Sequence, residues 1–267
     1  MIDGHQDHSL VPSIDEINVW IAYHDRPMSP DALARCRDVL SDEELEQERL
    51  FRSSTDRHAY LVTRATQRQI LSRCTGVEPR ALRFIKNSFG RPALDQPLGC
   101  RETFDFNISH DGNVTILGVA NNRIGLDVAA LRNRPSFLKV ARRFFCQGET
   151  AALEAMPAEC QSDRFLEYWT LKEAYVKARG GGLSIPLDTF AFDLEEPGKI
   201  VFQTHETPMD ASWTFWQFRP TAELLVSICA GQETTPRTRV TFHEIQPFSA
   251  EVTLTCAPFR IAAGAAA

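Results

Sequence analysis

Hydrophobic and polar positions along the chain predict two successive blocks, each with helices followed by short strands. In the first block, residues 17–23 (INVWIAY) have the composition of a strand. Ser41 and Glu44 form a capping-box pair that opens a helix, and a longer helix is predicted from about Thr55 to Cys74. Four strand-like segments follow, separated by turns: LRFI, FDFNIS, VTILGVA and RIGLDVA.

The second block repeats this order of helices and strands. Helical patterns cover 136–145, 148–156 and 162–178, and strand-like segments return after Pro186. Groups of helices that alternate with groups of strands predict an α+β fold. The block ends, TILGVANN and LLVSICAGQ, resemble each other, which indicates related halves. We expect an N-terminal half over 1–123, a C-terminal half over 124–250 and a frayed tail over 251–267.

Composition and charge exclude several classes of protein. The 267 residues are 43% hydrophobic and 24% charged, which is typical of a globular protein. The net charge of −6 argues against a nucleic-acid partner, and no stretch approaches the about 18 consecutive apolar residues of a membrane span. The polar N-terminus does not resemble a signal peptide, so we expect a cytoplasmic protein. The seven scattered cysteines are expected to be reduced thiols.

The predicted helix 162–178 carries the first candidate site. Glu173 falls on a face that also holds apolar residues, where a carboxylate needs a counter-charge or a metal ion. The alternative is a plain i,i+4 ion pair between Glu173 and Lys177. The sequence otherwise has no Walker A loop, G-x-G-x-x-G, H-E-x-x-H or G-x-S-x-G motif.

Two strand ends carry the other candidate sites. Asp127 follows a strand-forming run, and with Glu173 it would suffice to hold Mg²⁺ against a substrate phosphate, although alone it could simply cap a turn. Ser109 and His110 stand where a strand runs into a turn and could donate to phosphate; a lone histidine is also often structural.

The helix from Thr55 to Cys74 has a basic side. Arg57, Arg64 and Arg68 fall within a narrow arc of this helix, away from its apolar stripe. A solvated face is the alternative to a site for an anion.

Taken together and in order, FNISHDG, RIGLDVA and FLEYWTLKEAYVKARGGGLSIPLDTF resemble the signature blocks of the Sfp-type 4′-phosphopantetheinyl transferases, in the W-x-x-K-E-A subgroup. NSFGRPAL and VARRFF resemble two further blocks, and the likeness spans about residues 40–190. The resemblance implies transfer of the phosphopantetheine arm of coenzyme A to a serine of an apo acyl- or peptidyl-carrier protein, with release of adenosine 3′,5′-bisphosphate. It also implies two similar α/β halves in a pseudo-twofold arrangement, with coenzyme A and Mg²⁺ in the cleft between them.

The resemblance implies roles for individual residues. Asp127 and Glu173 match the magnesium carboxylates, and Lys177 matches the lysine that neutralises the pyrophosphate, so these three are the expected catalytic residues. The expected coenzyme A contacts are Arg52, Arg57, Arg91, Ser109, His110, Lys172 and Lys177. One position departs from the family pattern, because Ala129 stands where a second acid is common two residues after the aspartate.

Two other functions stay open: a Mg²⁺-dependent hydrolase of coenzyme A or nucleotides, and a coenzyme A-binding relative without enzymatic activity. The expected partner, an acidic carrier protein, needs a basic or apolar docking patch. Candidates for this patch are Arg132, Arg134, Lys139, Arg142, Arg143, Phe144 and Phe145, with a solvated face as the alternative. Because the chain is long enough to supply both walls of one cleft, we expect a monomer.

Overall fold

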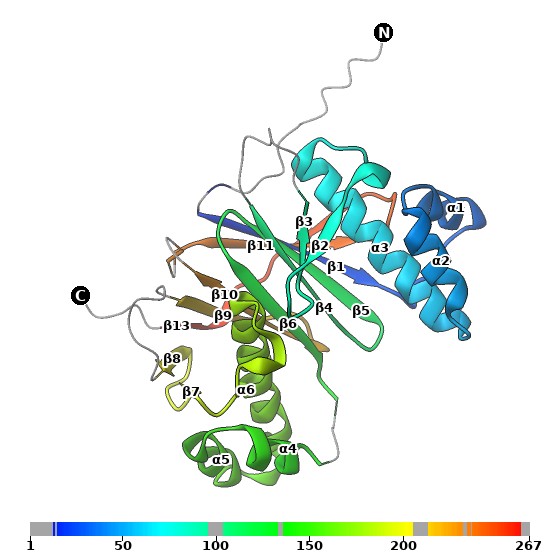
Figure 1. Ribbon diagram of the computed structural model, residues 1–267. Helices are drawn as coiled ribbons and strands as arrows, with labels where there is room; N and C mark the ends of the chain where they lie inside the picture. The colour runs from blue at the N-terminus through cyan, green and yellow to red at the C-terminus, as the bar shows by residue number, and fades with distance from the viewer. Residues whose placement is uncertain are drawn as a thin grey trace.

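The computed structural model describes residues 13, 15–95, 104–132, 136–204, 213–231, 234–235 and 237–262, and its two halves repeat one series of elements (Figure 1). Each half has a strand, two short helices, a 22-residue helix, a short 3-10 helix and two strand pairs. The first half holds β1 (Glu16–Tyr23), α1 (Pro30–Asp38), α2 (Asp42–Leu50), α3 (Ser54–Thr75), η1 (Pro79–Ala81), β2 (Phe84–Lys86), β3 (Pro92–Leu94), β4 (Asp105–Asp111) and β5 (Val114–Ala120).

The second half gives the same order. It holds β6 (Ile124–Ala130), α4 (Phe137–Phe144), α5 (Gln147–Glu154), α6 (Ala158–Arg179), η2 (Gly182–Ser184), β7 (Phe190–Asp193), β8 (Lys199–Thr204), β9 (Trp213–Thr221) and β10 (Leu224–Gly231). Three strands follow: β11 (Arg239–Ile245), β12 (Val252–Leu254) and β13 (Pro258–Ala262). The predicted α+β fold with two similar halves is confirmed.

Two sheets share one apolar core and are each covered by a long helix. The five-stranded sheet has the order β12-β11-β1-β5-β4, and the six-stranded sheet has the order β6-β10-β9-β13-β8-β7. Side chains from both sheets, such as Ile21 of β1, Leu126 of β6 and Phe242 of β11, are buried together between them. Helix α3 covers the outer face of the first sheet and α6 that of the second (Figure 1).

The two sheets meet along β4 and β6, which are joined by side chains rather than by backbone pairing. Alternate residues of a strand point to the same side, and four polar residues of β4 face β6 in this way. Asp105, Asn107 and Asp111 accept the main-chain N–H groups of residues 124, 126 and 130 at 3.0, 3.0 and 2.8 Å. Ser109 donates its hydroxyl to Asp127 Oδ1 at 2.7 Å. We call this junction the β4–β6 seam, and it accounts for the polar spacing of DFNISHD.

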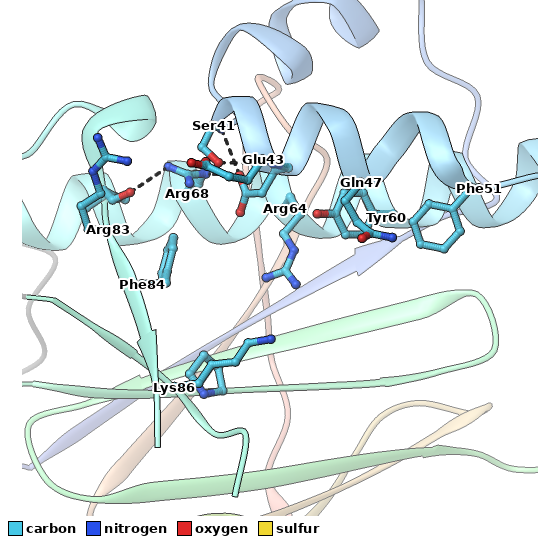
Figure 2. A pocket seen from close by; sticks show the side chains of 13 residues that line it. Ser41, Glu43, Gln47, Phe51, Tyr60, Arg64, Arg68, Arg83, Phe84 and Lys86 are labelled. Carbon is cyan, nitrogen blue, oxygen red and sulfur yellow. Dashed lines mark hydrogen bonds and ion pairs between the residues drawn. The ribbon is translucent and has the colours of Figure 1, made fainter. Parts of the chain in front are cut away.

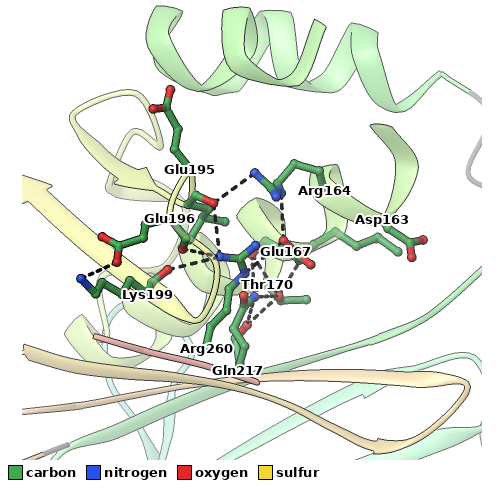
Figure 3. A network of polar contacts seen from close by, with 12 residues as sticks. Asp163, Arg164, Glu167, Thr170, Glu195, Glu196, Lys199, Gln217 and Arg260 are labelled. Carbon is green, nitrogen blue, oxygen red and sulfur yellow. Dashed lines mark hydrogen bonds and ion pairs between the residues drawn. The ribbon is translucent and has the colours of Figure 1, made fainter. Parts of the chain in front are cut away.

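Within the segment predicted as a frayed tail, 251–267, the described residues 251–262 instead add a strand to each sheet. β12 pairs with β11, which itself runs parallel to β1, and β13 lies between β9 and β8. Arg260 of β13 points into a buried polar network with Glu167 and donates to three carbonyls, those of residues 194, 196 and 199 (Figure 3). The prediction of a frayed tail is therefore wrong for these strands, because both are held in place by β-sheet pairing. Residues 263–267 lie outside the described part.

A buried ion pair joins α2 and α3 in the first half. Ser41 and Glu44 form the predicted capping box at the start of α2. The Glu44 carboxylate also accepts from Arg68 Nε of α3 at 2.5 Å. Arg68 then donates to the carbonyls of Pro79 and Leu82 at 2.6 and 3.2 Å. Part of the basic side of α3 is thus neither solvated nor free to bind an anion.

The second half has a corresponding ion pair, between α5 and α6, made by different residues. Glu149 stands at the third position of α5, accepts from the N–H of Cys146, and pairs with Lys172 Nζ of α6 at 2.8 Å. Lys172 donates onward to the carbonyl of Phe190 at 2.8 Å, and its ammonium lies 4.5 Å from the centre of that ring. Lys172 is therefore the counterpart of Arg68, and the internal repeat extends to individual side chains.

Two simpler expectations concern membranes and cysteines. Within the described ranges, no helix combines the length and the apolar character required to cross a membrane. Cys36, Cys146, Cys160, Cys229 and Cys256 are free thiols, and Cys36, Cys74 and Cys229 are buried. Cys100 lies outside the described residues.

Candidate active site

Asp127 and Lys177 are in contact beside the β4–β6 seam, and the charges of both act on Glu173. Lys177 Nζ lies 2.6 Å from Asp127 Oδ1 and 2.7 Å from Ser109 Oγ, and Ser109 Oγ lies 2.7 Å from the same Asp127 oxygen. Asp127 is 7% exposed and Ser109 is 3% exposed. Three groups from β4, β6 and α6, separated by up to 68 residues, thus form one cluster at the junction of the halves.

The local sequence places the cluster between β6 and α6. On β6, Leu126 and Val128 point into the core between the sheets, so Asp127 points the other way, toward α6. Glu173 and Lys177 are four residues apart on α6 and therefore share one face. Gly125 permits the close approach of α6, since a Cβ there would lie 2.1 Å from the carbonyl oxygen of residue 174. Sequence reasoning missed this glycine, although it stands two residues before Asp127.

The environment of Glu173 is short of positive charge. Burial raises the pKa of the Glu173 carboxyl, and the neighbouring Asp127 carboxylate raises this pKa further, against the opposing effect of Lys177. Two adjacent carboxylates suit a hard divalent cation that keeps water and substrate oxygens as its other ligands. Across the described ranges, no three histidine, cysteine or carboxylate side chains gather as a metal-binding group. Ala129 is packed in the apolar core beside α6 and offers no third ligand.

Ser109 and His110 are neighbours in sequence but lie on opposite faces of the first sheet. Ser109 belongs to the seam, whereas His110 is exposed and pairs in register with Thr115. Thr115 accepts or donates a hydrogen bond with His24 Nε2 at 2.9 Å, on the side covered by α3. The structure therefore places His110 next to a second histidine and does not bring its side chain into the seam with Ser109.

Because of this environment, stability should depend on the protonation of His24. Burial, with smaller contributions from His110 and His58, lowers the pKa of His24 to about 4. In the unfolded chain a histidine has a pKa of about 6.5, so below this pH the unfolded state takes up a proton that the folded state does not. Between pH 7 and pH 5, His24 is expected to lower the free energy of unfolding by about 2 kcal/mol.

Urea unfolding at both pH values checks this expectation. In His24→Gln, which retains a polar side chain near Thr115, the loss of stability on acidification should be smaller than in the parent protein by that amount. An identical pH dependence in the two proteins would contradict the assignment.

A cavity of about 600 Å³ opens between α2, α3 and β2 (Figure 2). Its walls include the aromatic rings of Phe51, Tyr60 and Phe84. Arg64 of α3 and Lys86 of β2 point toward each other across it. Arg64 Nε is buried and has no hydrogen-bond partner among the described residues. Two converging cations with an unused buried donor indicate a site for an anion.

The structure does not bring the predicted cations Arg52 and Arg57 into this cavity. Both are exposed around the start of α3, and Arg57 Nη2 donates to the carbonyl of Phe51 at 2.7 Å. The described residues that line the cavity include Arg64, Arg68, Arg83 and Lys86 instead. Lys86 could not have been singled out from the sequence, because only the tertiary structure brings β2 opposite α3.

Two further predicted coenzyme A contacts, Lys172 and Arg91, are engaged within the protein. Lys172 is completely buried and is held by Glu149, so no ligand can reach its ammonium. Burial also lowers the pKa of Lys172, against the attraction of Glu149. Arg91 is engaged within the protein, with Nη2 at 2.5 Å from Asp105 and Nη1 on the carbonyls of residues 177 and 178.

Some residues of the predicted docking patch are exposed on α4. Lys139, Arg142 and Arg143 are exposed, although Arg142 pairs with Glu154 at 2.7 Å. Phe144 is 42% exposed. Arg132 pairs with Asp111 at 2.9 Å, Phe145 is buried, and Arg134 lies outside the described residues. The apolar part of the patch is thus reduced to Phe144.

Two family models of known proteins match successive parts of the chain. A family model described as "4′-phosphopantetheinyl transferase superfamily" matches residues 123–229. A second model, described as "4′-phosphopantetheinyl transferase, N-terminal", matches residues 26–122. The two matches meet between β5 and β6 and together cover both halves.

Several curated proteins are similar over most of their length. The 4′-phosphopantetheinyl transferase Sfp of Bacillus subtilis is 28% identical over 232 residues, which are 86% of this chain and 100% of that protein. The 4′-phosphopantetheinyl transferase ffp of Bacillus subtilis is 31% identical over 72% of this chain and 84% of its own. The 4′-phosphopantetheinyl transferase HetI of a Nostoc species is 34% identical over 70% and 78%.

Proposed function

Because the chain belongs to the 4′-phosphopantetheinyl transferase superfamily, we propose that Asp127, Glu173 and Lys177 form the centre at which it transfers the phosphopantetheine arm of coenzyme A to a carrier-protein serine. The observation that carries this assignment is the contact of Lys177 Nζ with Asp127 at 2.6 Å at the seam, with Glu173 near enough for both charges to act on its pKa. Adenosine 3′,5′-bisphosphate is the second product.

In the proposed reaction, the serine oxygen attacks the phosphorus that bears the pantetheine arm. The bond from this phosphorus to the oxygen of adenosine 3′,5′-bisphosphate breaks, and the serine proton passes to Glu173. A carboxylate with a raised pKa is a better proton acceptor near neutral pH than an ordinary glutamate. Lys177 neutralises charge on the pyrophosphate oxygens, as expected for a transfer that depends on positioning and electrostatics.

Mg²⁺ is the proposed metal, held by Asp127 and Glu173. A bound magnesium ion would supply charge neutralisation for the pyrophosphate and the leaving bisphosphate. The two carboxylates support this proposal. The negative charge of Asp127 raises the pKa of Glu173, and a cation bound between the two carboxylates would relieve this repulsion. The other ligands would be water and substrate oxygens.

The nucleotide end of coenzyme A is proposed to lie in the cavity between α2, α3 and β2. Arg64 and Lys86 supply positive charge for a phosphate, and the aromatic walls suit a base. Lys86 precedes the loop 87–91, which contacts the end of α6 near Lys177. One coenzyme A molecule could therefore extend from this cavity to the seam. His110, on the same face as α3, remains a proposed phosphate contact.

Arg64→Ala is expected to raise KM for coenzyme A by about 10- to 100-fold, because a charge-assisted hydrogen bond contributes roughly 1.5–3 kcal/mol. Lys86→Ala should act in the same direction, and kcat should change less than KM in both variants. Initial rates at varied coenzyme A concentration measure this effect. Arg80→Ala is the control, since Arg80 is exposed and pairs with Asp42. Unchanged KM values in both test variants would place the nucleotide elsewhere.

Incubation with coenzyme A, Mg²⁺ and a panel of apo carrier proteins tests the function itself. Intact-mass analysis should show the added arm on at least one carrier. No mass gain on any carrier would refute the assignment. Release of adenosine 3′,5′-bisphosphate without a carrier would indicate a hydrolase, and stabilisation by coenzyme A without Mg²⁺ dependence would indicate a binding protein.

The same panel of carriers tests whether carrier proteins dock on Lys139, Arg143 and Phe144. Gel filtration tests the expected monomer. The expected location in the cytoplasm stays a prediction.

A further inference from the structure

A loop from the first half closes the C-terminal end of the helix that carries Glu173 and Lys177. This loop, residues 87–91, joins β2 to β3. Asn87 Nδ2 donates to the carbonyl of Gly180 at 2.8 Å, and Arg91 Nη1 donates to the carbonyl of Ala178 at 3.0 Å and to that of Lys177. Carbonyls in the last turn of a helix have no donor within the helix. The loop therefore caps α6 from the opposite half of the molecule.

The capping loop is itself held in one shape. Asn87 Oδ1 accepts the N–H groups of Phe89 and Arg91 at 3.0 and 2.9 Å. The main chain closes the loop, because the N–H of Asn87 donates to the carbonyl of Arg91 at 3.0 Å. Gly90 has φ +87°, a conformation that favours glycine. A loop bonded in this way can hold a helix end in a fixed place.

Arg91 connects the helix end to the seam. Its Nη2 lies 2.5 Å from Asp105 Oδ2 and 2.9 Å from the carbonyl of Ile124, while Nη1 faces the last turn of α6. One side chain thus links the capping loop to β4, β6 and α6. A planar guanidinium with several donors can do this, whereas a lysine ammonium cannot span these partners at once.

We infer that Arg91 is a positioning residue for the transfer reaction, which fixes Lys177 by holding the main-chain carbonyl of that residue. The inference rests on the proposed function. Lys177 has a long, flexible side chain whose ammonium must stay at the carboxylate cluster. Arg91 holds the backbone end of this residue, and Asp127 and Ser109 hold the ammonium end. Lys86, which lines the nucleotide cavity, directly precedes the capping loop.

Arg91→Lys tests the inference with a matched control, Arg260→Lys. Arg260 is also a guanidinium that donates to several carbonyls, at 3.2 to 3.3 Å, but it lies in the network around Glu167. Both variants retain the positive charge and lose the planar fork. Arg91→Lys is expected to lower kcat by about tenfold or more, with KM for coenzyme A unchanged within about twofold. Arg260→Lys is expected to lower the melting temperature while kcat stays that of the parent protein.

Three results would overturn the inference. A raised KM with normal kcat in Arg91→Lys would make Arg91 a coenzyme A ligand. An equal loss of kcat in both variants would make its role purely structural, and parental kinetics in Arg91→Lys would remove the role altogether.

Failure of the proposed function is distinguishable, since the parent protein would then transfer no arm to any carrier. Hydrogen exchange would still test the cap, because the last turn of α6 should exchange faster in Arg91→Lys and not in Arg260→Lys. Unchanged exchange in Arg91→Lys would refute the cap.

Discussion

Replacing Glu173 with glutamine is expected to lower kcat for arm transfer by about 10²- to 10⁴-fold, the usual contribution of a positioned general base. Glutamine has nearly the shape of glutamate but cannot accept the serine proton, and it provides no negative charge for a metal ion. The time course of mass gain on an apo carrier, with saturating coenzyme A and Mg²⁺, measures the effect.

Stability provides the control for this experiment. The pKa of Glu173 is raised by burial and by Asp127, so the ionised carboxylate is destabilising where it stands. Glu173→Gln should therefore be at least as stable as the parent protein, and a loss of activity cannot be attributed to unfolding. Glu159→Gln, an exposed change in the first turn of the same helix, should leave kcat unchanged. Parental activity in Glu173→Gln would contradict the proposed mechanism.

Lys172→Met is expected to lower the free energy of unfolding by about 3–5 kcal/mol, because it leaves the buried Glu149 carboxylate without its counter-charge. This loss is a large part of the free energy of unfolding of a typical domain, which is roughly 5–15 kcal/mol. Urea or thermal unfolding measures the loss. If Lys172 instead bound coenzyme A, the variant would be stable and KM would rise, which is the opposite pattern.

A second substitution separates lost charge from lost packing. Adding Glu149→Gln to Lys172→Met should recover much of the stability, since replacing both members of a buried pair is often close to neutral. Lys199→Met is the matched surface control. Lys199 pairs with Glu196 at the surface, and its loss should cost at most about 0.5 kcal/mol. No recovery in the double variant would mean that packing around Lys172, rather than charge, is what Lys172→Met disturbs.

Local sequence patterns predicted most of the helices and strands. The capping box at Ser41 and Glu44 opens α2, and the apolar stripe of the next helix covers the first sheet, since periodicity and capping act within a few residues. The C-terminal strands were not predicted, because β12 is only three residues long and β13 gains its stability from β8 and β9, which are far away in sequence. No local pattern around Arg260 therefore indicated that it enters a buried network.

Residue type and spacing made Asp127, Glu173 and Lys177 candidates, but left a turn-capping acid and a plain i,i+4 ion pair as alternatives. A strand places alternate residues on one side, and a helix places residues four apart on one face, so the acid of β6 and the pair on α6 were expected to be available. The resemblance of the ordered blocks then assigned them to one site. The structure brings all three together, although the partner of Lys177 is Asp127 on another element.

By itself, the sequence determined the class of fold and the order of elements, which follow from periodicity, and the resemblance of its ordered motifs gave the family and the three proposed central residues. Only the tertiary structure decided which cations are available for a ligand. Lys172 and Arg91 have the residue types that bind phosphate, but burial and internal carbonyls occupy them, whereas Arg64 and Lys86 converge on a cavity. Whether a cation can bind a ligand depends on which groups, distant in sequence, already accept its N–H groups. A local sequence pattern does not contain this information.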